Sequence, residues 1–176
     1  MEHKLEDPKR TGELNPPETL KRIGLKKDGA FCDIGAGTGI FTFAAAEQTQ
    51  SDIYAVEISD AFFQILQAKR LESKADKVQL LKDVRDVPSN SCGTVLLCTV
   101  LHELEDIQAM MREIKRILRP EGVLAVIEFH KRQTPLGPPE VRRISPGQVE
   151  EILKQCGLCQ KEYFELGENF YVQLAK

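Results

Sequence analysis

The sequence predicts an α/β fold built on a mostly parallel sheet. Apolar runs that suit buried strands alternate with amphipathic helical patterns, and the run 94–101 is nearly all apolar, as in a central parallel strand. The chain closes with a short hairpin, which makes one strand antiparallel. Its 176 residues suit one domain and are too few for two of ordinary size. We therefore expect a single domain over residues 1–176, with an N-terminal arm at 1–15.

The first half of the chain reads as three strands separated by helices. Prolines open the segment 16–23, as in the first turn of a helix, and Gly24 ends it. The expected strands are 30–33, 52–57 and 78–81. The other expected helices are 40–48 and 61–73, the second one capped by Asp60.

The second half continues the alternation. Strand 94–101 precedes an amphipathic helix at 107–118, and a turn at 119–122 leads into strand 123–129. A loop rich in Pro, Gly and Arg follows at 130–144. Ser145 is expected to cap a last helix that ends at Gln155. Tyr163 and Tyr171 lie in the two strands of the final hairpin, which turns at 167–169.

A glycine-rich turn between two acids is the most informative feature of the sequence. Gly35, Gly37 and Gly39 follow the strand that ends at Asp33, and glycines let a backbone approach a ligand closely. Glu57 ends the next strand, where a carboxylate can accept hydrogen bonds from ribose hydroxyls. This arrangement predicts a nucleotide-type ligand.

The glycine spacing narrows the choice of nucleotide. Dinucleotide-binding proteins use G-x-G-x-x-G and place a pyrophosphate at the helix N-terminus, whereas this chain has G-x-G-x-G with Asp33 directly before it. A carboxylate there would repel a pyrophosphate and would suit a ligand with an ammonium group and a sulfonium. The segment 33–39 resembles the D-x-G-x-G-x-G motif of the class I S-adenosylmethionine-dependent methyltransferases.

Three further segments are similar to small enzymes of the ubiquinone/menaquinone methyltransferase type. They are Leu80–Pro88, Leu101–Asp106 and Arg116–Gly122. The resemblance implies a three-layer Rossmann-like sandwich with seven strands, the last one reversed, and S-adenosyl-L-methionine as the cofactor. The chain departs from the pattern at Lys82, where a Gly is usual, and at Cys92–Thr94, where a Phe-Asp pair is usual. The adenine pocket could therefore differ in shape.

The resemblance also implies roles for individual residues. Asp33 would face the ammonium of the cofactor, Glu57 would bind both ribose hydroxyls, and Ile58 would cover one face of the adenine. Asp83 would accept from the adenine amino group, and Thr99 would line the methionine side. The implied cofactor-binding residues are Asp33, Gly35, Ala36, Gly37, Thr38, Gly39, Glu57, Ile58, Asp83, Val84 and Thr99.

Two histidines are the candidate general bases. His102 and His130 follow the fourth and fifth strands, at the edge where open α/β sheets bind ligands. Either could instead have a structural role. In similar enzymes the region after the fifth strand contributes to the acceptor pocket, and here Arg142 and Arg143 could hold an anionic acceptor. The loop 130–144 could equally be a solvated connection.

Composition limits the other functions. A net charge of −3 argues against a nucleic-acid partner, and no apolar run reaches the length of a membrane span. We expect a cytoplasmic protein without a metal site, since the C-x-x-C at 156–159 has no second ligand pair. The favoured function is methyl transfer to a small molecule. The alternatives are a non-catalytic S-adenosylmethionine-binding protein and an NAD-binding oxidoreductase. A homodimer is among the expected assemblies, because a partner subunit could enclose the acceptor.

Overall fold

The computed structural model describes residues 2–25 and 29–176 and contains a seven-stranded sheet in the order β3-β2-β1-β4-β5-β7-β6. Neighbouring strands from β3 to β5 are parallel, and β7 is antiparallel to both β5 and β6. The strands are β1 (Ala30–Ile34), β2 (Ile53–Val56), β3 (Val78–Leu81), β4 (Cys92–Cys98), β5 (Leu118–Phe129), β6 (Gln160–Leu166) and β7 (Phe170–Ala175). The predicted fold class, including the reversed last strand, is confirmed.

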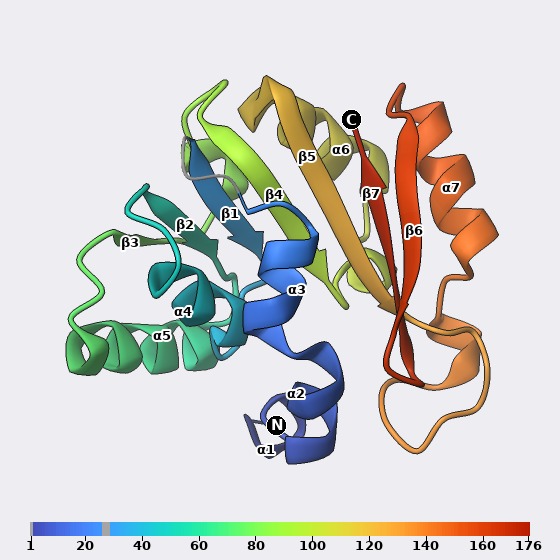
Figure 1. Cartoon of the computed structure of the whole chain (residues 1–176), viewed down its shortest axis with the longest axis horizontal. Helices are drawn as coiled ribbons and strands as arrows, with labels where there is room; N and C mark the ends of the chain where they lie inside the picture. Colours follow the sequence, from blue (N-terminus) through green and yellow to red (C-terminus); the bar gives the residue numbers. More distant parts are fainter. Residues whose placement is uncertain (1, 26–28) are drawn as a thin grey trace.

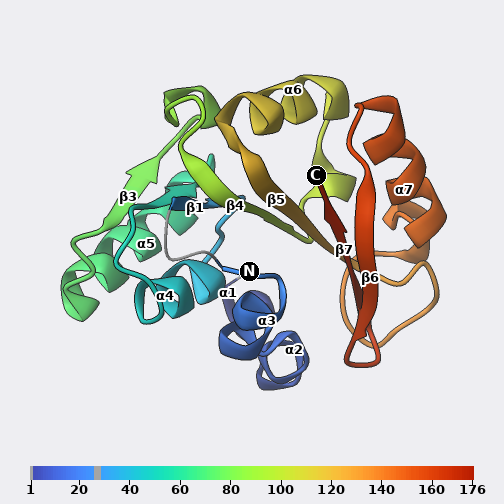
Figure 2. The ribbon, with the colours of Figure 1, turned by 45° about the horizontal axis from the view of Figure 1, so that its top comes forward.

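Helices cover both faces of the sheet and complete three layers (Figures 1 and 2). One face packs against α3 and α4, with a contribution from α5, and the other packs against α6 and α7. The α-helices are α1 (Glu2–Leu5), α2 (Pro8–Leu14), α3 (Pro16–Arg22), α4 (Ile40–Ala46), α5 (Asp60–Ser73), α6 (Ile107–Ile117) and α7 (Pro146–Gln155). Short 3₁₀ turns are η1 (Val84–Asp86), η2 (Leu101–Glu103) and η3 (Glu140–Arg142).

Strand β4 shows why the central runs are apolar rather than alternating. Val95 and Leu97 point into the core under α6 and α7, whereas Leu96 points into the core on the opposite face. All three side chains are fully buried. A parallel strand covered on both faces has no solvent-facing side, so an unbroken apolar run is what the sheet requires.

Several element boundaries differ from the sequence-based expectation. Ser59, not Asp60, caps α5, because its hydroxyl accepts from the Phe62 amide, while Asp60 is the first helical residue. Strand β4 ends at Cys98, and the backbone then turns at Thr99, whose φ is +57°. Strand β5 begins at Leu118, within the region expected to be helix end and turn, because its first residues pair with β4 at Cys92.

The N-terminal arm contains two helices that the sequence patterns did not predict. Asp7 caps α2 by accepting from the amides of Lys9 and Arg10 at 2.9 and 3.1 Å. A proline follows this cap, as is usual at the first helical position. Figure 1 shows both helices at the edge of the sheet where β1 and β4 end.

The arm is fastened at both of its ends. Near its start, Glu6 pairs with Lys69 of α5. Near its end, Glu13 accepts hydrogen bonds from the backbone amides of Glu168 and Asn169 at 3.1 and 3.0 Å, and from the Asn169 side chain at 2.6 Å. The arm therefore crosses the edge of the sheet from α5 to the turn between β6 and β7.

We expect Glu13→Ala to lower the free energy of unfolding by about 1–3 kcal/mol, because three donors at the hairpin turn lose a charged acceptor. Chemical denaturation followed by circular dichroism measures the change. Glu18→Ala is the matched control, since Glu18 pairs with Lys21 at an exposed position and should contribute less than about 1 kcal/mol. Equal stabilities of the two variants would show that Glu13 does not fasten the arm.

Candidate cofactor and acceptor site

The glycine loop after β1 is fixed by close contacts that leave no room for larger residues. At Gly35, φ is +71° and a Cβ would lie 2.4 Å from Cγ2 of Val100, the residue that follows Thr99. At Gly37, φ is +56° and a Cβ would lie 3.1 Å from Cδ1 of Leu5 in the arm. The loop thus packs between the segment after β4 and the N-terminal arm, and glycine is required at both positions.

Glu57 links this loop to the start of α5. Its carboxylate is buried and accepts the Gly37 amide at 2.8 Å through Oε2 and the Ser59 amide at 2.8 Å through Oε1. Each oxygen of an ionised carboxylate can accept a second hydrogen bond, so both retain capacity for a ligand. Glu57 therefore also supports the local fold, because it accepts the buried Gly37 amide and the partly buried Ser59 amide.

Asp33 is a buried acid at the end of β1. Its side chain is directed to the helix side of the loop, where Oδ2 accepts from the Thr42 hydroxyl at 2.6 Å. Burial raises the pKa of Asp33 from 3.8 to about 6, although the hydrogen bonds from Thr42 act in the opposite direction. At neutral pH the Asp33 carboxylate is therefore ionised, and its burial in this form lowers the stability of the protein. A nearby cation would reduce this loss of stability.

Strand β4 ends beside this loop, because β1 and β4 are neighbours in the sheet. From this central pair, the sheet continues with β2 and β3 on one side and with β5 on the other. The strand order therefore reverses between β1 and β4, which flank the topological switch point. Thr99 lies there in the left-handed region, which non-glycine residues adopt mainly where surrounding structure enforces it. Its amide donates to the Ile127 carbonyl at 2.7 Å.

Arg10 of α2 reaches the same point and was not identified from the sequence. Its guanidinium donates to the Thr99 hydroxyl at 3.2 Å and to the Leu5 carbonyl at 2.8 Å. The residue is 7% exposed. Asp7 and Pro8 were the visible signals of a helix start here, but no sequence pattern connects position 10 with position 99.

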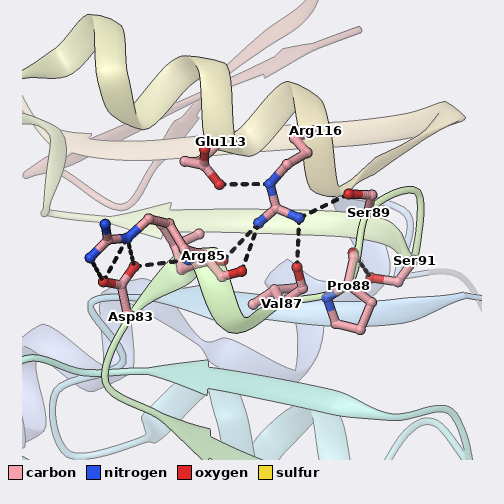
Figure 3. Close-up of polar contacts among 9 residues, drawn as sticks. Asp83, Arg85, Val87, Pro88, Ser89, Ser91, Glu113 and Arg116 are labelled. Carbon is pink, nitrogen blue, oxygen red and sulfur yellow. Dashed lines mark hydrogen bonds and ion pairs between the residues drawn. The ribbon is translucent and has the colours of Figure 1, made fainter.

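The residues expected to surround the adenine lie beyond Glu57. Ile58 is 84% exposed, which leaves its side chain free to cover a ligand, while Val84 is buried. Asp83 forms an ion pair with Arg85, and the Arg85 amide also donates to it at 2.9 Å. These hydrogen bonds lower the pKa of Asp83 to about 2. Asp83 and Arg85 lie side by side in Figure 3.

Arg116 of α6 holds the turn that carries Asp83 and Val84 (Figure 3). Its guanidinium donates to the carbonyl oxygens of Val84, Arg85 and Val87 at 3.1, 3.3 and 2.8 Å, and its Nε pairs with Glu113 at 2.7 Å. No sequence pattern connects position 116 with this turn. The turn at the expected adenine side is thus fastened to α6.

His102 is paired with a buried acid that the sequence analysis did not single out. Its Nδ1 lies 2.8 Å from Oε2 of Glu128, and its amide donates to Oε1 at 3.3 Å. The side chains are 3% and 0% exposed. Burial acts to lower the pKa of His102, but the hydrogen bond and charge of Glu128 outweigh it, so the pKa is raised above 6.5. In the sequence, an acidic residue near the end of the apolar run of β5 was the signal that could have identified Glu128.

His130 lies further along the same edge. Its Nε2 contacts a carboxylate oxygen of Glu165, and the other oxygen of Glu165 accepts from the Tyr163 hydroxyl. The imidazole ring is 5.4 Å from the ring of Tyr171. His130 is thus bound to the β6–β7 hairpin, whereas His102 is bound to β5, and the structure brings the two candidate bases into separate clusters.

The two arginines expected at the acceptor side differ in their environment. Arg143 is 3% exposed, and its guanidinium donates to the carbonyl oxygens of His130, Arg132, Leu136 and Pro138 at 2.7–3.0 Å. The donors of Arg143 are thus directed into the loop, and its contact with an acceptor stays a prediction. Arg142 is exposed.

An open groove lies apart from these residues. It has a volume of about 750 Å³ and is formed by α2, α3 and the β6–β7 turn, with Lys9, Glu13, Arg22 and Glu168 among its lining residues. It is open and of mixed charge. Across residues 2–25 and 29–176, no group of three or more potential metal ligands is found, and no helix is long and apolar enough to span a membrane.

We expect Asp33→Asn to stabilise the ligand-free protein at neutral pH. The folded-state pKa lies above the unfolded value of 3.8, so the wild type loses stability as the pH rises from about 4 through about 6. Relative to the variant, this loss is on the order of 2–3 kcal/mol. Chemical denaturation at pH 3.5 and 7.5 measures it, with the exposed Asp76→Asn as the control. A stability difference between variant and wild type that does not change with pH would contradict the assignment.

The known proteins to which this chain is similar are consistent with the site described above. The chain matches the methyltransferase domain family over residues 32–126. It is similar to the ubiquinone/menaquinone biosynthesis C-methyltransferase UbiE of Hahella chejuensis (strain KCTC 2396), with 27% identity over 124 residues, which cover 67% of this chain and 50% of that protein. The UbiE protein of Burkholderia mallei (strain SAVP1) is 25% identical over 122 residues, with the same coverage. The chain thus spans about half the length of these curated relatives.

Solved structures agree over nearly the whole chain. A SAM-dependent methyltransferase from Aquifex aeolicus has a TM-score of 0.91 and 25% identity, and the match covers 99% of this chain and 95% of that one. A putative type 11 methyltransferase from Sulfolobus solfataricus has a TM-score of 0.78 and 25% identity, covering 92% and 90%. The predicted resemblance to the class I S-adenosylmethionine-dependent methyltransferases is confirmed, and the chain belongs to the methyltransferase domain family.

Proposed function

We propose that this protein transfers a methyl group from S-adenosyl-L-methionine to a small-molecule acceptor. The observation that carries the proposal is the arrangement at the switch point: a buried acid, a glycine loop and a second buried acid. Asp33 lies one residue before the end of β1, Glu57 follows β2, and the loop after β1 is open to close approach because of its glycines. In open α/β sheets, ligands bind at this position.

The contacts of Glu57 support a role in ribose binding. Its two oxygens are oriented by the amides of Gly37 and Ser59, and each keeps one lone pair for a ribose hydroxyl. The neighbouring Ile58 is exposed and can cover one face of the adenine, with Val84 on the other side. We propose that Asp83 accepts from the adenine amino group while it remains paired with Arg85.

The burial of Asp33 supports a role at the methionine end. A carboxylate whose pKa is raised by burial gains most from a cationic partner, and the cofactor offers an ammonium group. Thr99, at the end of β4, would line the same end of the ligand. The amides of the glycine loop, Ala36 and Thr38 included, would complete the enclosure.

Methyl transfer from a sulfonium is an in-line displacement by a nucleophile of the acceptor. Since the cofactor is already activated, the protein mainly aligns the two reactants and excludes water. A base is needed only if the nucleophile arrives protonated. We propose His102 for this role ahead of His130, because Glu128 orients its ring and stabilises its protonated form.

The acceptor side is formed by the loop 130–144 and the arm 1–15. Arg142 is the basic residue of the pair that stays available for an anionic acceptor, since Arg143 is occupied within the loop. The relatives named above are described as C-methyltransferases of ubiquinone and menaquinone biosynthesis, so carbon is one candidate nucleophile. Four expectations stay predictions. They are a single domain, a cytoplasmic location, the absence of a nucleic-acid partner and a homodimer.

We expect S-adenosylmethionine and S-adenosylhomocysteine to bind with dissociation constants in the micromolar range, on the order of −8 kcal/mol. Asp33 would repel the pyrophosphate of NAD, so NAD should not bind measurably. Isothermal titration calorimetry with the three ligands tests this. Preferential binding of NAD would favour the oxidoreductase alternative. Binding without turnover of methyl-labelled cofactor on any metabolite pool would favour the non-catalytic alternative.

We expect Glu57→Ala to weaken the binding of S-adenosylhomocysteine by about 1.5–3 kcal/mol, because the ribose loses hydrogen bonds to a charged group. Calorimetry measures the affinity, and circular dichroism checks that the variant remains folded. Glu47→Ala is the matched control, as Glu47 lies exposed at the other end of α4 from the glycine loop. An unchanged affinity of Glu57→Ala would show that the ribose lies elsewhere.

A further inference from the structure

Arg116 supports the turn at the expected adenine side with every donor that its guanidinium has. Its five N–H groups make five hydrogen bonds, four of them to the segment 84–89 (Figure 3). The acceptors are the carbonyl oxygens of Val84, Arg85 and Val87, the Ser89 hydroxyl and the Glu113 carboxylate. Because the protein itself occupies all five donors, an effect of Arg116 on ligand binding must act through the turn.

This set of contacts needs the planar shape of a guanidinium. The Nε of Arg116 donates to Glu113 at 2.7 Å, and each terminal nitrogen donates to two oxygens of the segment 84–89 at 2.8–3.3 Å. Glu113 lies one turn earlier on α6 and orients the guanidinium toward the turn. A lysine ammonium has three donors on a flexible stem and cannot make the same contacts. The position therefore requires an arginine and not only a positive charge.

Arg85 connects this support to the carboxylate of Asp83. Its carbonyl oxygen accepts from Arg116 at 3.3 Å, and its own amide donates to Oδ1 of Asp83 at 2.9 Å. The Arg85 side chain donates to both oxygens of the same carboxylate. These hydrogen bonds lower the pKa of Asp83 to about 2, so the carboxylate is a pure acceptor at neutral pH. Arg116 thus fixes the backbone of the residue that orients the acid.

We propose that Arg116 is a positioning residue that sets the selectivity of the site for a 6-aminopurine ring. The inference rests on the proposed function, in which Asp83 accepts from the adenine amino group, and it adds a residue of α6 that does not contact the ligand. Adenine presents an N–H donor at C6, whereas hypoxanthine presents a carbonyl oxygen there, which a carboxylate repels. Such discrimination requires an acceptor that is held in place, because a carboxylate that can turn away accommodates either group.

Two ligands that differ only in the purine base test this selectivity. S-adenosylhomocysteine carries adenine, and S-inosylhomocysteine carries hypoxanthine. In isothermal titration calorimetry the wild type should prefer the first by about tenfold or more, as expected for a hydrogen bond to a charged group. Arg116→Met should reduce this preference to within about threefold, and Arg116→Lys to an intermediate value. Arg112→Met, at an exposed position of the same helix, should keep the preference of the wild type.

A second background shows whether Arg116 acts through Asp83. Asp83→Ala removes the acceptor, so this change alone should abolish the preference for adenine. Adding Arg116→Met should then leave the ratio of the two affinities unchanged, because the two residues act as one unit on the base. A further change in the ratio would show that Arg116 acts on the base by another route and would overturn the inference.

The outcomes separate the inference from the function beneath it. If the wild type binds neither ligand, the proposed function fails and the inference fails with it. If the wild type binds both ligands equally, the inference is overturned while the proposed cofactor is supported. If Arg116→Met weakens both ligands by the same factor, Arg116 only stabilises the fold and the inference is overturned. If Arg116→Met does not fold, the ratio of affinities measured with Arg116→Lys decides in the same way.

Discussion

The carboxylate of Glu57 is the interaction on which the geometry of the site depends. It accepts one amide from the glycine loop after β1 and one from the N-cap residue of α5, so a single buried side chain fixes two neighbouring strand ends relative to each other. The loop itself has glycines in the left-handed region, which offer little rigidity of their own. Without this acceptor, the buried Gly37 N–H and the partly buried Ser59 N–H would lose their partner, and the loop would lose the shape that admits a ligand.

The remaining charges of the site are buried with fewer compensating contacts. Among the described residues, the one side chain that donates to Asp33 is Thr42, and the guanidinium of Arg10 contacts neutral oxygens. Glu128 is the exception, because His102 pairs with it. Such groups destabilise the ligand-free protein and favour a ligand that brings complementary charge.

Local patterns predicted the parts of the site that lie close together in sequence. Asp33 and the glycines form one motif, and Glu57 follows at the end of the next strand. The residue types and their spacing were therefore sufficient to predict a nucleotide-type ligand at these positions. Arg10 and Glu128 were missed because their partners, Thr99 and His102, come from distant elements. Arg143 was assigned to the acceptor since a basic residue in a polar loop gives no sign of burial. The mostly parallel α/β class followed from the alternation of elements, whereas the two arm helices depend on contacts with the hairpin and α5.

A crystal structure of the protein with S-adenosylhomocysteine is the measurement that tests this account most directly. The account predicts that the ligand crosses the strand ends at β1 and β4. The ribose hydroxyls would lie within hydrogen-bond distance of Glu57, and the ammonium would face Asp33. A ligand bound in the groove between α2, α3 and the hairpin, or one whose ribose lies away from Glu57, would contradict it.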